Sequence, residues 1–314
     1  MVKAIVQREL GGPEVLRIEE VEAPEPIPTE VQVRVRAAGV NPVDFKTRQG
    51  KGMAAVLGGP PFTVGWDVCG EVTAVGGGVT RFAVGDEVFG MPWFPRQAGA
   101  YAEYVTAPSR HFAGKPHAFS VEEAGALPLA GLTAWQIVVD TIRVQDGDDV
   151  LIHGAAGGVG HLAVQVAAAR GATVIATARR EQADFLARLG AARTLDYRDD
   201  DFDSQVGDLD SVIDFTGGYG ERSLAALRPG GTLVSVPSGV EPALHALGEA
   251  QHKRVTGILV EPDPVGLAGL CDLIEQGKLA IEVGETFDLE DAAAAHRHAE
   301  SGGHGAGKVV LRVP

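Results

Sequence analysis

The chain of 314 residues contains only two cysteines, Cys69 and Cys271. Two cysteines exclude a four-cysteine structural zinc site, and their apolar surroundings predict reduced core thiols rather than a disulfide. No apolar run reaches the length that a membrane span needs. The start of the chain carries charges within its first ten residues and has no apolar signal-peptide core. These absences lead us to expect a cytoplasmic protein.

Basic residues are also scarce. The chain has 27 Lys and Arg against 42 Asp and Glu, which gives a formal net charge of −15. This excess of negative charge argues against nucleic acid or an anionic membrane as a partner. An anionic ligand would need a local group of basic residues to overcome the repulsive background. With 45% hydrophobic residues, the composition predicts a globular protein with a sizeable core, and the length favours two domains.

The pattern of apolar residues changes along the chain. Residues 1 to about 120 contain alternating or β-branched runs broken by Gly and Pro, which predict β structure. A capping box, Ser120 with Glu123, then predicts a helix start. Beyond it, five short apolar runs alternate with helix-length segments: VLIH, TVIATA, TLDY, SVIDF and TLVSV. This alternation predicts an α/β domain with a doubly wound parallel sheet of the Rossmann type. A last helix (287–301) and the strand GKVVLRV follow, and we expect that strand to return to the first domain.

A glycine-rich turn follows the first of these five runs. Gly154, Gly157 and Gly160 are spaced three residues apart, with Ala155 at the first position of the usual G-x-G-x-x-G fingerprint. The turn follows a predicted strand and opens a predicted helix, which is the context that dinucleotide binding requires. There Gly157 lets the backbone approach the pyrophosphate and Gly160 allows close packing of helix and strand, while the helix N-terminus faces the phosphates.

The second strand, TVIATA, ends without the acidic residue that NAD enzymes place there. Its last position is Ala178, and Arg179 and Arg180 follow. A guanidinium group matches a phosphate in a bidentate manner, whereas a cation near a helix start is otherwise slightly unfavourable. We therefore expect Arg179 and Arg180 to bind the 2′-phosphate of NADP(H).

Together with these features, eight ordered motifs resemble the zinc-independent quinone oxidoreductase and enone or alkenal reductase branch of the medium-chain dehydrogenase/reductase superfamily, which includes zeta-crystallin. They are AAGVNPVDFKTRQG, VGWDVCGEVTAVG, VGDEVFG, GAYAEYV, ALPLAGLTAW, HGAAGGVG, LGAARTLDY and ALRPGGTLVSV. The resemblance implies a β-rich GroES-like catalytic domain at 1–122, completed by 283–314, and a Rossmann NADP-binding domain at 123–282. The active site is then expected between the two.

Zinc alcohol dehydrogenases of the same superfamily hold a catalytic zinc with Cys, His and Cys. The matching positions here are Asn41, Trp66 and the neighbourhood of Leu129. Neither Asn nor Trp is a usual zinc ligand, and the histidines show no metal-ligand spacing, so no metal site is expected.

The resemblance also assigns site residues. Asn41 is expected to contact the nicotinamide ribose or to line the substrate side, Thr133 to reach the nicotinamide end, and Tyr197 to lie beside the 2′-phosphate with Arg179. Asp44 either orients Lys46 or caps a helix start after Pro42. Tyr101 is either a second proton donor or a core tyrosine. The full expected set is Lys46, Asp44 and Tyr101 for catalysis, and Asn41, Thr133, Ala155, Gly157, Gly158, Val159, Gly160, Arg179, Arg180 and Tyr197 for the cofactor.

Without a Lewis acid, reduction of an activated double bond is easier than reduction of a simple carbonyl. The resemblance therefore implies an NADPH-dependent reductase of a quinone or of the C=C bond of an α,β-unsaturated ketone or aldehyde. An enoyl reductase acting on a thioester or polyketide intermediate and a non-catalytic NADPH-binding protein stay open. By analogy with the family, the apolar segment RVTGILV (254–260) is expected to be an edge strand that pairs in a homodimer.

Overall fold

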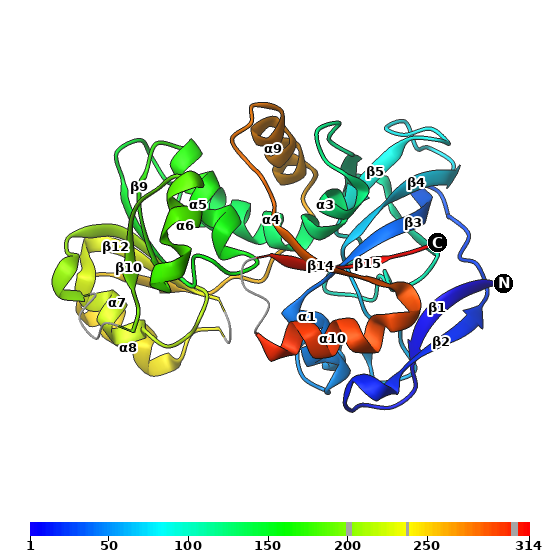
Figure 1. Ribbon diagram of the computed structural model, residues 1–314, viewed down its shortest axis with the longest axis horizontal. Coiled ribbons are helices and arrows are strands. Elements are labelled where there is room, and N and C mark those ends of the chain that lie inside the picture. The colour runs from blue at the N-terminus through cyan, green and yellow to red at the C-terminus, as the bar shows by residue number, and fades with distance from the viewer. Residues whose placement is uncertain (199–202, 237–238, 303–306) are drawn as a thin grey trace. The chain divides into compact units, whose positions relative to one another are not determined.

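The computed structural model describes residues 1–198, 203–236, 239–302 and 307–314 (Figure 1). By their contacts the residues form two compact units. The first comprises residues 1–132, 261–275 and 281–314, and the second comprises 133–260 and 276–280. Helix α4 (Pro128–Trp135) runs from the first unit into the second. No described helix combines the length and the apolar character needed to cross a bilayer.

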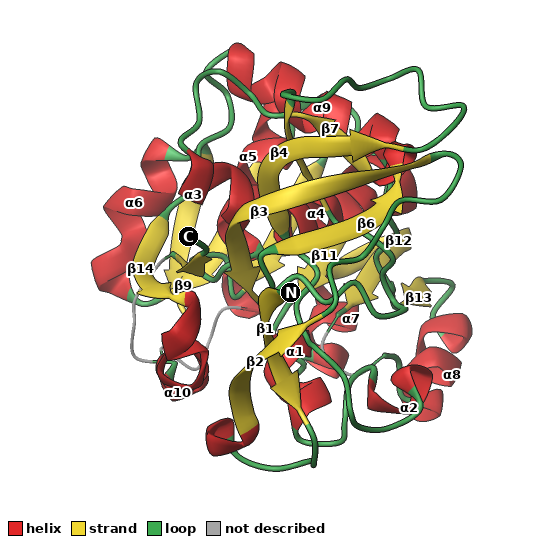
Figure 2. Ribbon diagram, turned by 90° about the vertical axis from the view of Figure 1, so that its right-hand side faces the viewer, coloured by secondary structure: helices red, strands yellow, loops and turns green. Residues whose placement is uncertain are grey.

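The first unit is rich in β structure (Figure 2). Among the described residues, a seven-stranded sheet has the order β14-β15-β3-β4-β5-β7, with β6 paired to β3, and β1 and β2 form a separate antiparallel pair. The strands are β1 (Val2–Gln7), β2 (Leu16–Val21), β3 (Glu30–Val40), β4 (Val68–Val75), β5 (Glu87–Gly90), β6 (Tyr104–Pro108), β7 (Phe112–Gly114), β14 (Val283–Asp288) and β15 (Lys308–Arg312). Its helices are α1 (Pro42–Arg48), α2 (Ala54–Leu57), α3 (Val121–Ala126), α9 (Pro264–Glu275) and α10 (Ala292–Ser301).

Strand β3 shows why this sequence forms a half-covered sheet. Val31, Val33 and Val35 are fully buried and alternate with residues that are more exposed, since successive side chains of a strand point to opposite faces. The C-terminal strand β15 pairs antiparallel with β3, from Val309 opposite Val40 to Arg312 opposite Ala37. The predicted return of the last strand to the first part of the chain is therefore confirmed.

The second unit contains a six-stranded parallel sheet of order β10-β9-β8-β11-β12-β13, counted within the described ranges. All five predicted strands are present in it. The strands are β8 (Asp149–His153), β9 (Thr173–Ala178), β10 (Ala191–Asp196), β11 (Leu209–Asp214), β12 (Leu227–Ser235) and β13 (Arg254–Thr256). The connecting helices are α5 (Gly160–Ala169), α6 (Ala183–Arg188), α7 (Gly220–Ala226) and α8 (Pro242–Ala250). The strand order reverses between β8 and β11, and ligands of such sheets bind at this reversal.

The compact units differ in extent from the ranges expected from the sequence. Helices α3 and α9 lie in the first unit, where α3 packs against β3 and β4. Strand β13 ends at Thr256, so the strand expected over 254–260 is shorter than anticipated. The boundaries of the catalytic and cofactor domains at residues 122 and 283 stay a prediction.

Candidate functional site

The glycine turn of the second unit connects β8 to α5, as the sequence predicted. Gly154 has a φ of +70°, a conformation that side chains other than glycine rarely adopt. A Cβ atom at Gly160 would lie 2.2 Å from the carbonyl oxygen of Gly154 and 2.8 Å from the Cα of Ala155. Position 160 therefore has no room for a side chain, because the start of α5 is in direct contact with the backbone of the turn that follows β8.

The first amides of α5 make this turn a candidate anion site. Within the described residues, the N–H groups of Gly158, Val159 and Gly160 donate to no protein acceptor. Gly157 is exposed, while Ala155 is completely buried beneath the turn. Unpaired amides at a helix N-terminus carry partial positive charge and point at whatever lies before the helix. The predicted cofactor residues of the turn thus form a cradle suited to a pyrophosphate.

The arginines lie where the second strand ends. Arg179 follows the buried Ala178 directly and is exposed, and its side chain has no partner among the described residues. Tyr197, 42% exposed, donates its backbone N–H to the carbonyl of Ala178 at 3.4 Å, which brings it beside this strand end. Thr133 is buried in α4. The guanidinium of Arg179 is accordingly available to an external anion.

The neighbouring arginines, Arg180 and Arg198, bond to acidic residues of the protein. Arg198 pairs with Asp196 at 2.6 Å and with Glu181 at 3.4 Å, and this pairing holds the pKa of Asp196 well below its usual range. Arg180 donates its backbone N–H to Asp196 at 3.1 Å. The charge of the two carboxylates near the strand end is thus partly offset by Arg198, so they oppose a phosphate beside Arg179 less than free carboxylates would.

Asp214, at the end of β11, organises the adjacent loop. Its carboxylate accepts hydrogen bonds from the backbone N–H of Thr216 at 2.7 Å, Gly217 at 2.9 Å and Tyr219 at 3.3 Å. Burial alone would raise the pKa of Asp214, but the bonds from Thr216 and Gly217 outweigh it and lower that pKa. A loop tied to one ionised carboxylate in this way presents its side chains in fixed positions.

Tyr219 lies on a buried histidine. The ring of His153, the last residue of β8, stacks on Tyr219 with a centroid distance of 4.6 Å. His153 is itself held by the hydroxyls of Thr177 at 3.0 Å and Ser223 at 3.2 Å, and burial lowers its pKa to about 4, so the ring is neutral. Burial raises the pKa of Tyr219, although the nearby Arg222 guanidinium opposes that shift.

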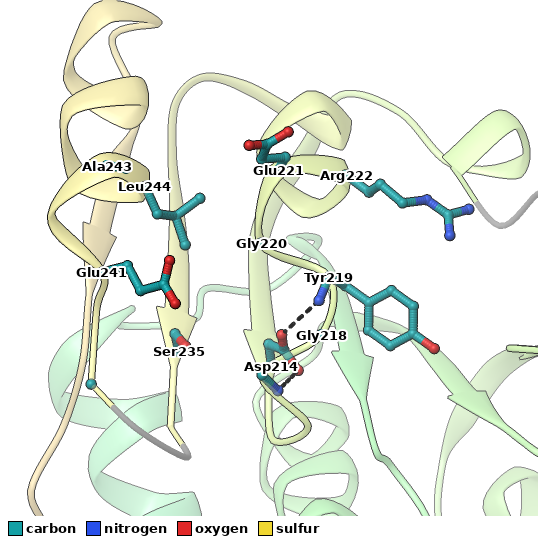
Figure 3. Close-up of a pocket in the computed structure, with 12 residues that line it drawn as sticks. Asp214, Gly218, Tyr219, Gly220, Glu221, Arg222, Ser235, Glu241, Ala243 and Leu244 are labelled. Atoms are coloured by element: carbon teal, nitrogen blue, oxygen red, sulfur yellow. Dashed lines mark hydrogen bonds between the residues drawn. The ribbon is translucent and has the colours of Figure 1, made fainter.

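A pocket of about 470 Å³ lies beside this loop, between the start of α7 and the start of α8 (Figure 3). In Figure 3 the side chains of Tyr219 and Arg222 point to the same side of the loop, and the Arg222 guanidinium lies 6.0 Å from the Tyr219 ring centroid. The pocket is lined by Asp214, Gly217, Gly218, Tyr219, Gly220, Glu221, Arg222, Ser235, Gly239, Glu241, Ala243 and Leu244. Sequence reasoning missed this loop, although an acidic residue at a strand end followed by two glycines is a usable signal.

In the first unit, the residues of the NPVDFK segment lie in a buried polar network. The Asn41 side chain donates to Asp67 at 2.8 Å and accepts from Lys308, and its backbone N–H donates to Asp44 at 2.6 Å. Asn41 is 1% exposed, Asp67 0% and Lys308 5%. A flipped Asn41 amide would place its NH₂ against an ammonium and its oxygen against a carboxylate, so the charges fix its orientation.

Asp44 caps α1. Its Oδ2 accepts from the backbone N–H of Asn41, and no ion pair joins Asp44 to Lys46 among the described residues. Of the two alternatives for Asp44, the structure thus supports the helix cap. Burial raises the pKa of Asp44 to about 7, and its Oδ1 is buried with no partner in the described structure. Lys46, two residues on, is half-buried.

Tyr101 is a core tyrosine with a bonded hydroxyl. It is completely buried, and its hydroxyl lies 3.1 Å from both Asp44 Oδ2 and His296 Nε2. Burial raises its pKa well above the usual value, so the phenol is neutral. No sequence pattern connects Tyr101 with His296, which is one of the histidines without metal-ligand spacing.

These residues do not fit a zinc ion. Both polar atoms of the Asn41 amide are engaged by Asp67 and Lys308, and the Trp66 indole, which has no lone pair to offer, donates its N–H to the carbonyl of Arg96 at 2.6 Å. Across the described ranges, no three His, Cys, Asp or Glu side chains are grouped so that they could hold a metal. Both cysteines are free thiols, as expected.

Comparison with known proteins agrees with both units. Residues 27–117 match the family model for the alcohol dehydrogenase GroES-like domain, and residues 189–311 match the model described as zinc-binding dehydrogenase. The chain is 34% identical to 2-haloacrylate reductase from a Burkholderia species, over 99% of each chain.

Among solved structures, quinone oxidoreductase from Coxiella burnetii is 38% identical, with a TM-score of 0.92 over 100% of this chain and 99% of that one. The quinone oxidoreductase of Escherichia coli in complex with NADPH is 30% identical, with a TM-score of 0.86 over 99% of each chain. With its glycine turn, its GroES-like unit and non-ligand residues at the zinc positions, the chain belongs to the zinc-independent quinone oxidoreductase branch of the medium-chain dehydrogenase/reductase superfamily.

Proposed function

We propose that this protein is an NADPH-dependent reductase that transfers hydride to a quinone or to the activated C=C bond of an α,β-unsaturated carbonyl compound, without zinc. The observation that carries the proposal is Arg179 at the end of β9, exposed and without a described partner, together with a glycine turn whose unpaired amides suit an anion. It is supported by the relatives, of which one is a 2-haloacrylate reductase and another is a quinone oxidoreductase in complex with NADPH.

The chain's own residues would hold the cofactor at several points. The amides of Gly158, Val159 and Gly160 bind the pyrophosphate, while Gly157 and Ala155 keep the backbone close to it. Arg179, Arg180 and Tyr197 bind the 2′-phosphate, and Thr133 contacts the nicotinamide end. Asn41 is buried, and both polar atoms of its amide are engaged by Asp67 and Lys308, so we do not retain it as a cofactor contact. When bound, the cofactor supplies the hydride. That hydride would pass to the β-carbon of the acceptor.

The electron pair of the acceptor's double bond then moves onto the carbonyl oxygen, giving an enolate or a quinol anion. We assign Lys46 to this developing charge, because an ammonium group close to it stabilises the transition state and can deliver the proton. Lys46 is half-buried in α1, with no ion-pair partner among the described residues. Asp44 and Tyr101 are completely buried, so their part in the proposal is to support α1 rather than to touch the substrate.

The domain boundaries, the cellular location and the oligomeric state are part of the same proposal. Residues 1–122 with 283–314 form the catalytic domain, and residues 123–282 form the cofactor domain. The protein acts in the cytoplasm as a homodimer. For the dimer, the supporting observations are the edge position of β13 and the exposed apolar side chain of Leu259, at 56%, which follows it in the same unit. Light scattering of the wild type and of Leu259→Asp would test the dimer.

The activity is tested by following NADPH oxidation with a panel of a small quinone, an α,β-unsaturated ketone, a 2-haloacrylate, an enoyl thioester and a saturated ketone. Turnover of the quinone or the enone, with none of the saturated ketone, is the expected result. Turnover of the thioester alone would make the protein an enoyl reductase. NADPH binding with no turnover of any acceptor would overturn the enzymatic proposal.

The role of Lys46 is tested by Lys46→Met, which should lower kcat on the enone by about 10²-fold and leave NADPH affinity nearly unchanged. Lys51→Met is the matched control, because Lys51 is an exposed lysine just after α1. A Lys46→Met enzyme that reduces enones at the wild-type rate would show that the proton comes from solvent.

A further inference from the structure

Helix α1 is fixed through one of its faces. Asp44 and Arg48 are four residues apart and therefore lie on the same face, and both are buried, at 0% and 1% exposure. Lys46 lies two residues from each, a rotation of about 200° around the helix, so it points to the opposite side. Whatever holds Asp44 and Arg48 therefore sets the side of α1 from which Lys46 projects.

Two residues distant in sequence hold that face. His296 Nδ1 lies 3.0 Å from Arg48 Nη1, and the Tyr101 hydroxyl lies 3.1 Å from both His296 Nε2 and Asp44 Oδ2. A guanidinium can only donate, so His296 Nδ1 is the acceptor and its proton is on Nε2. His296 then donates to the Tyr101 oxygen, and Tyr101 donates to Asp44. The chain of hydrogen bonds has one direction, and it joins the first turn of α1 to its last residue.

The remaining donors of Arg48 extend the same attachment. Its Nη2 pairs with Glu300 at 2.8 Å, and its Nε donates to the carbonyl of Gly11 at 3.1 Å. His296 and Glu300 are four residues apart on α10, so a single face of α10 meets a single face of α1. Every nitrogen of the guanidinium thus has a partner in the described structure, which leaves Arg48 one orientation.

The helix needs this support because it is short. α1 has seven residues, fewer than two turns, and helices of that length are not stable by themselves in water. The chain after it turns at Gly50 and Gly52, with φ values of +87° and +49°. Neither the helix nor its exit segment can therefore hold Lys46 in a fixed direction without tertiary contacts.

We propose that Tyr101 and His296 are positioning residues that clamp Asp44 and Arg48, and through them hold α1 in the orientation that directs Lys46 at the substrate. The inference rests on the proposed function, in which Lys46 meets the negative charge that follows hydride transfer. Tyr101 and His296 touch neither substrate nor cofactor in this scheme. They act by reducing the orientations open to Lys46, and a misplacement of about 1 Å in a reacting group can cost as much as 10²-fold in rate.

Tyr101→Phe removes only the hydroxyl that links His296 to Asp44. We expect kcat on an enone to fall about 10-fold, with KM for NADPH unchanged. In the Lys46→Met background the same substitution should lower kcat less than about 2-fold, because its effect passes through Lys46. Tyr104→Phe, in the same GAYAEY segment, is the matched control and should behave as wild type. An equal loss in both backgrounds would overturn the proposal, since general destabilisation acts without regard to Lys46.

A second pair of variants tests His296. His296→Gln keeps one acceptor and one donor and should retain most of the rate, whereas His296→Leu removes both and should reproduce the loss of Tyr101→Phe. Hydrogen–deuterium exchange of the peptide covering residues 42–50 gives a readout that needs no turnover. Exchange should be faster in Tyr101→Phe and His296→Leu than in Tyr104→Phe. Unchanged exchange in α1 would overturn the clamp, whether or not the protein reduces any acceptor. Faster exchange in a protein that reduces no acceptor would support the clamp and refute the proposed activity.

Discussion

The carboxylate of Asp67 lies 3.9 Å from the ammonium group of Lys308, and the Asn41 amide connects them. Burial raises the pKa of Asp67 to about 6 despite this cation and lowers the pKa of Lys308. Each charge therefore tolerates burial only because the other is present. Asn41 occupies one of the positions at which zinc-dependent relatives hold their metal, and Asp67 directly follows another.

Lys308→Met should destabilise the protein strongly, because it leaves Asp67 buried without its cation. Breaking a buried pair on one side costs roughly 3–5 kcal/mol. The double variant Asp67→Asn/Lys308→Met should be more stable than the sum of the single losses, since it leaves no lone charge. Denaturant unfolding of the four proteins of this cycle measures the effect. Strict additivity would mean that the two groups do not interact.

Asp44→Asn should change how stability depends on pH. Burial raises the pKa of Asp44 from 3.8 to about 7, so between about pH 4 and pH 7 the folded state holds a proton that the unfolded state has lost. Stability from this group is therefore full below pH 4 and falls as pH rises through that window, by about 4 kcal/mol. An asparagine at position 44 cannot ionise, so the variant does not lose this stability between pH 4 and pH 7.

We expect Asp44→Asn to be less stable than wild type at pH 5, because its NH₂ group takes the place of the unpartnered Oδ1. At pH 8 the difference should shrink or reverse. Urea unfolding of both proteins at the two pH values measures it. A difference in stability that is independent of pH would show that Asp44 is ionised throughout.

Gly160→Ala should damage both folding and cofactor binding. The new Cβ would meet the Gly154 carbonyl oxygen at 2.2 Å, and both clashing groups are backbone atoms that cannot rotate away. We expect a stability loss of about 1–3 kcal/mol, as for overpacking of a tight interior, and weaker NADPH binding by fluorescence titration. Gly147→Ala is not a matched control, because Gly147 has a φ of +87°. Gly207→Ala is better suited, since a Cβ atom at Gly207 would meet nothing within 4 Å and the φ of this residue is not positive.

Arg179→Ala should weaken NADPH binding selectively. A hydrogen bond to a charged group is worth roughly 1.5–3 kcal/mol, which corresponds to about 10–150-fold in affinity. NADH binding should hardly change, because NADH lacks the 2′-phosphate. Arg188→Ala, on the surface of α6, controls for the loss of one positive charge from the same unit. Equal weakening of both cofactors, or a wild type that prefers NADH, would contradict the role given to Arg179.

Chelation should leave activity intact. Asn41 and Trp66 at the ligand positions offer zinc no suitable donor atoms, so purified protein should contain well under one zinc per chain. Metal analysis and turnover before and after treatment with a strong chelator measure this. Stoichiometric zinc whose removal abolishes turnover, and whose return restores it, would contradict the zinc-independent chemistry.

The elements that depend on neighbouring residues could be predicted from the sequence. The glycine turn, the strands around it and the capping box of Ser120 and Glu123 all depend on backbone conformation and short-range hydrogen bonds, which residue type and spacing specify directly. The basic residue after β9, where NAD enzymes have an acidic one, was also predictable, because Arg179 directly follows Ala178 in the chain. The order of the eight family motifs then predicted a β-rich GroES-like fold and a Rossmann fold.

The buried polar contacts were decided by the tertiary structure alone. Tyr101 and His296 are separated by 195 residues, and Asn41 and Lys308 by 267, so no local pattern connects them. They meet because β15 pairs with β3 and because α10 packs against α1. A polar side chain far from water must find a partner wherever the fold brings one, and the sequence specifies the need for a partner but not its identity. The residue types determined the chemistry available to this protein, whereas the pairing of distant strands and helices decided which groups hold one another in place.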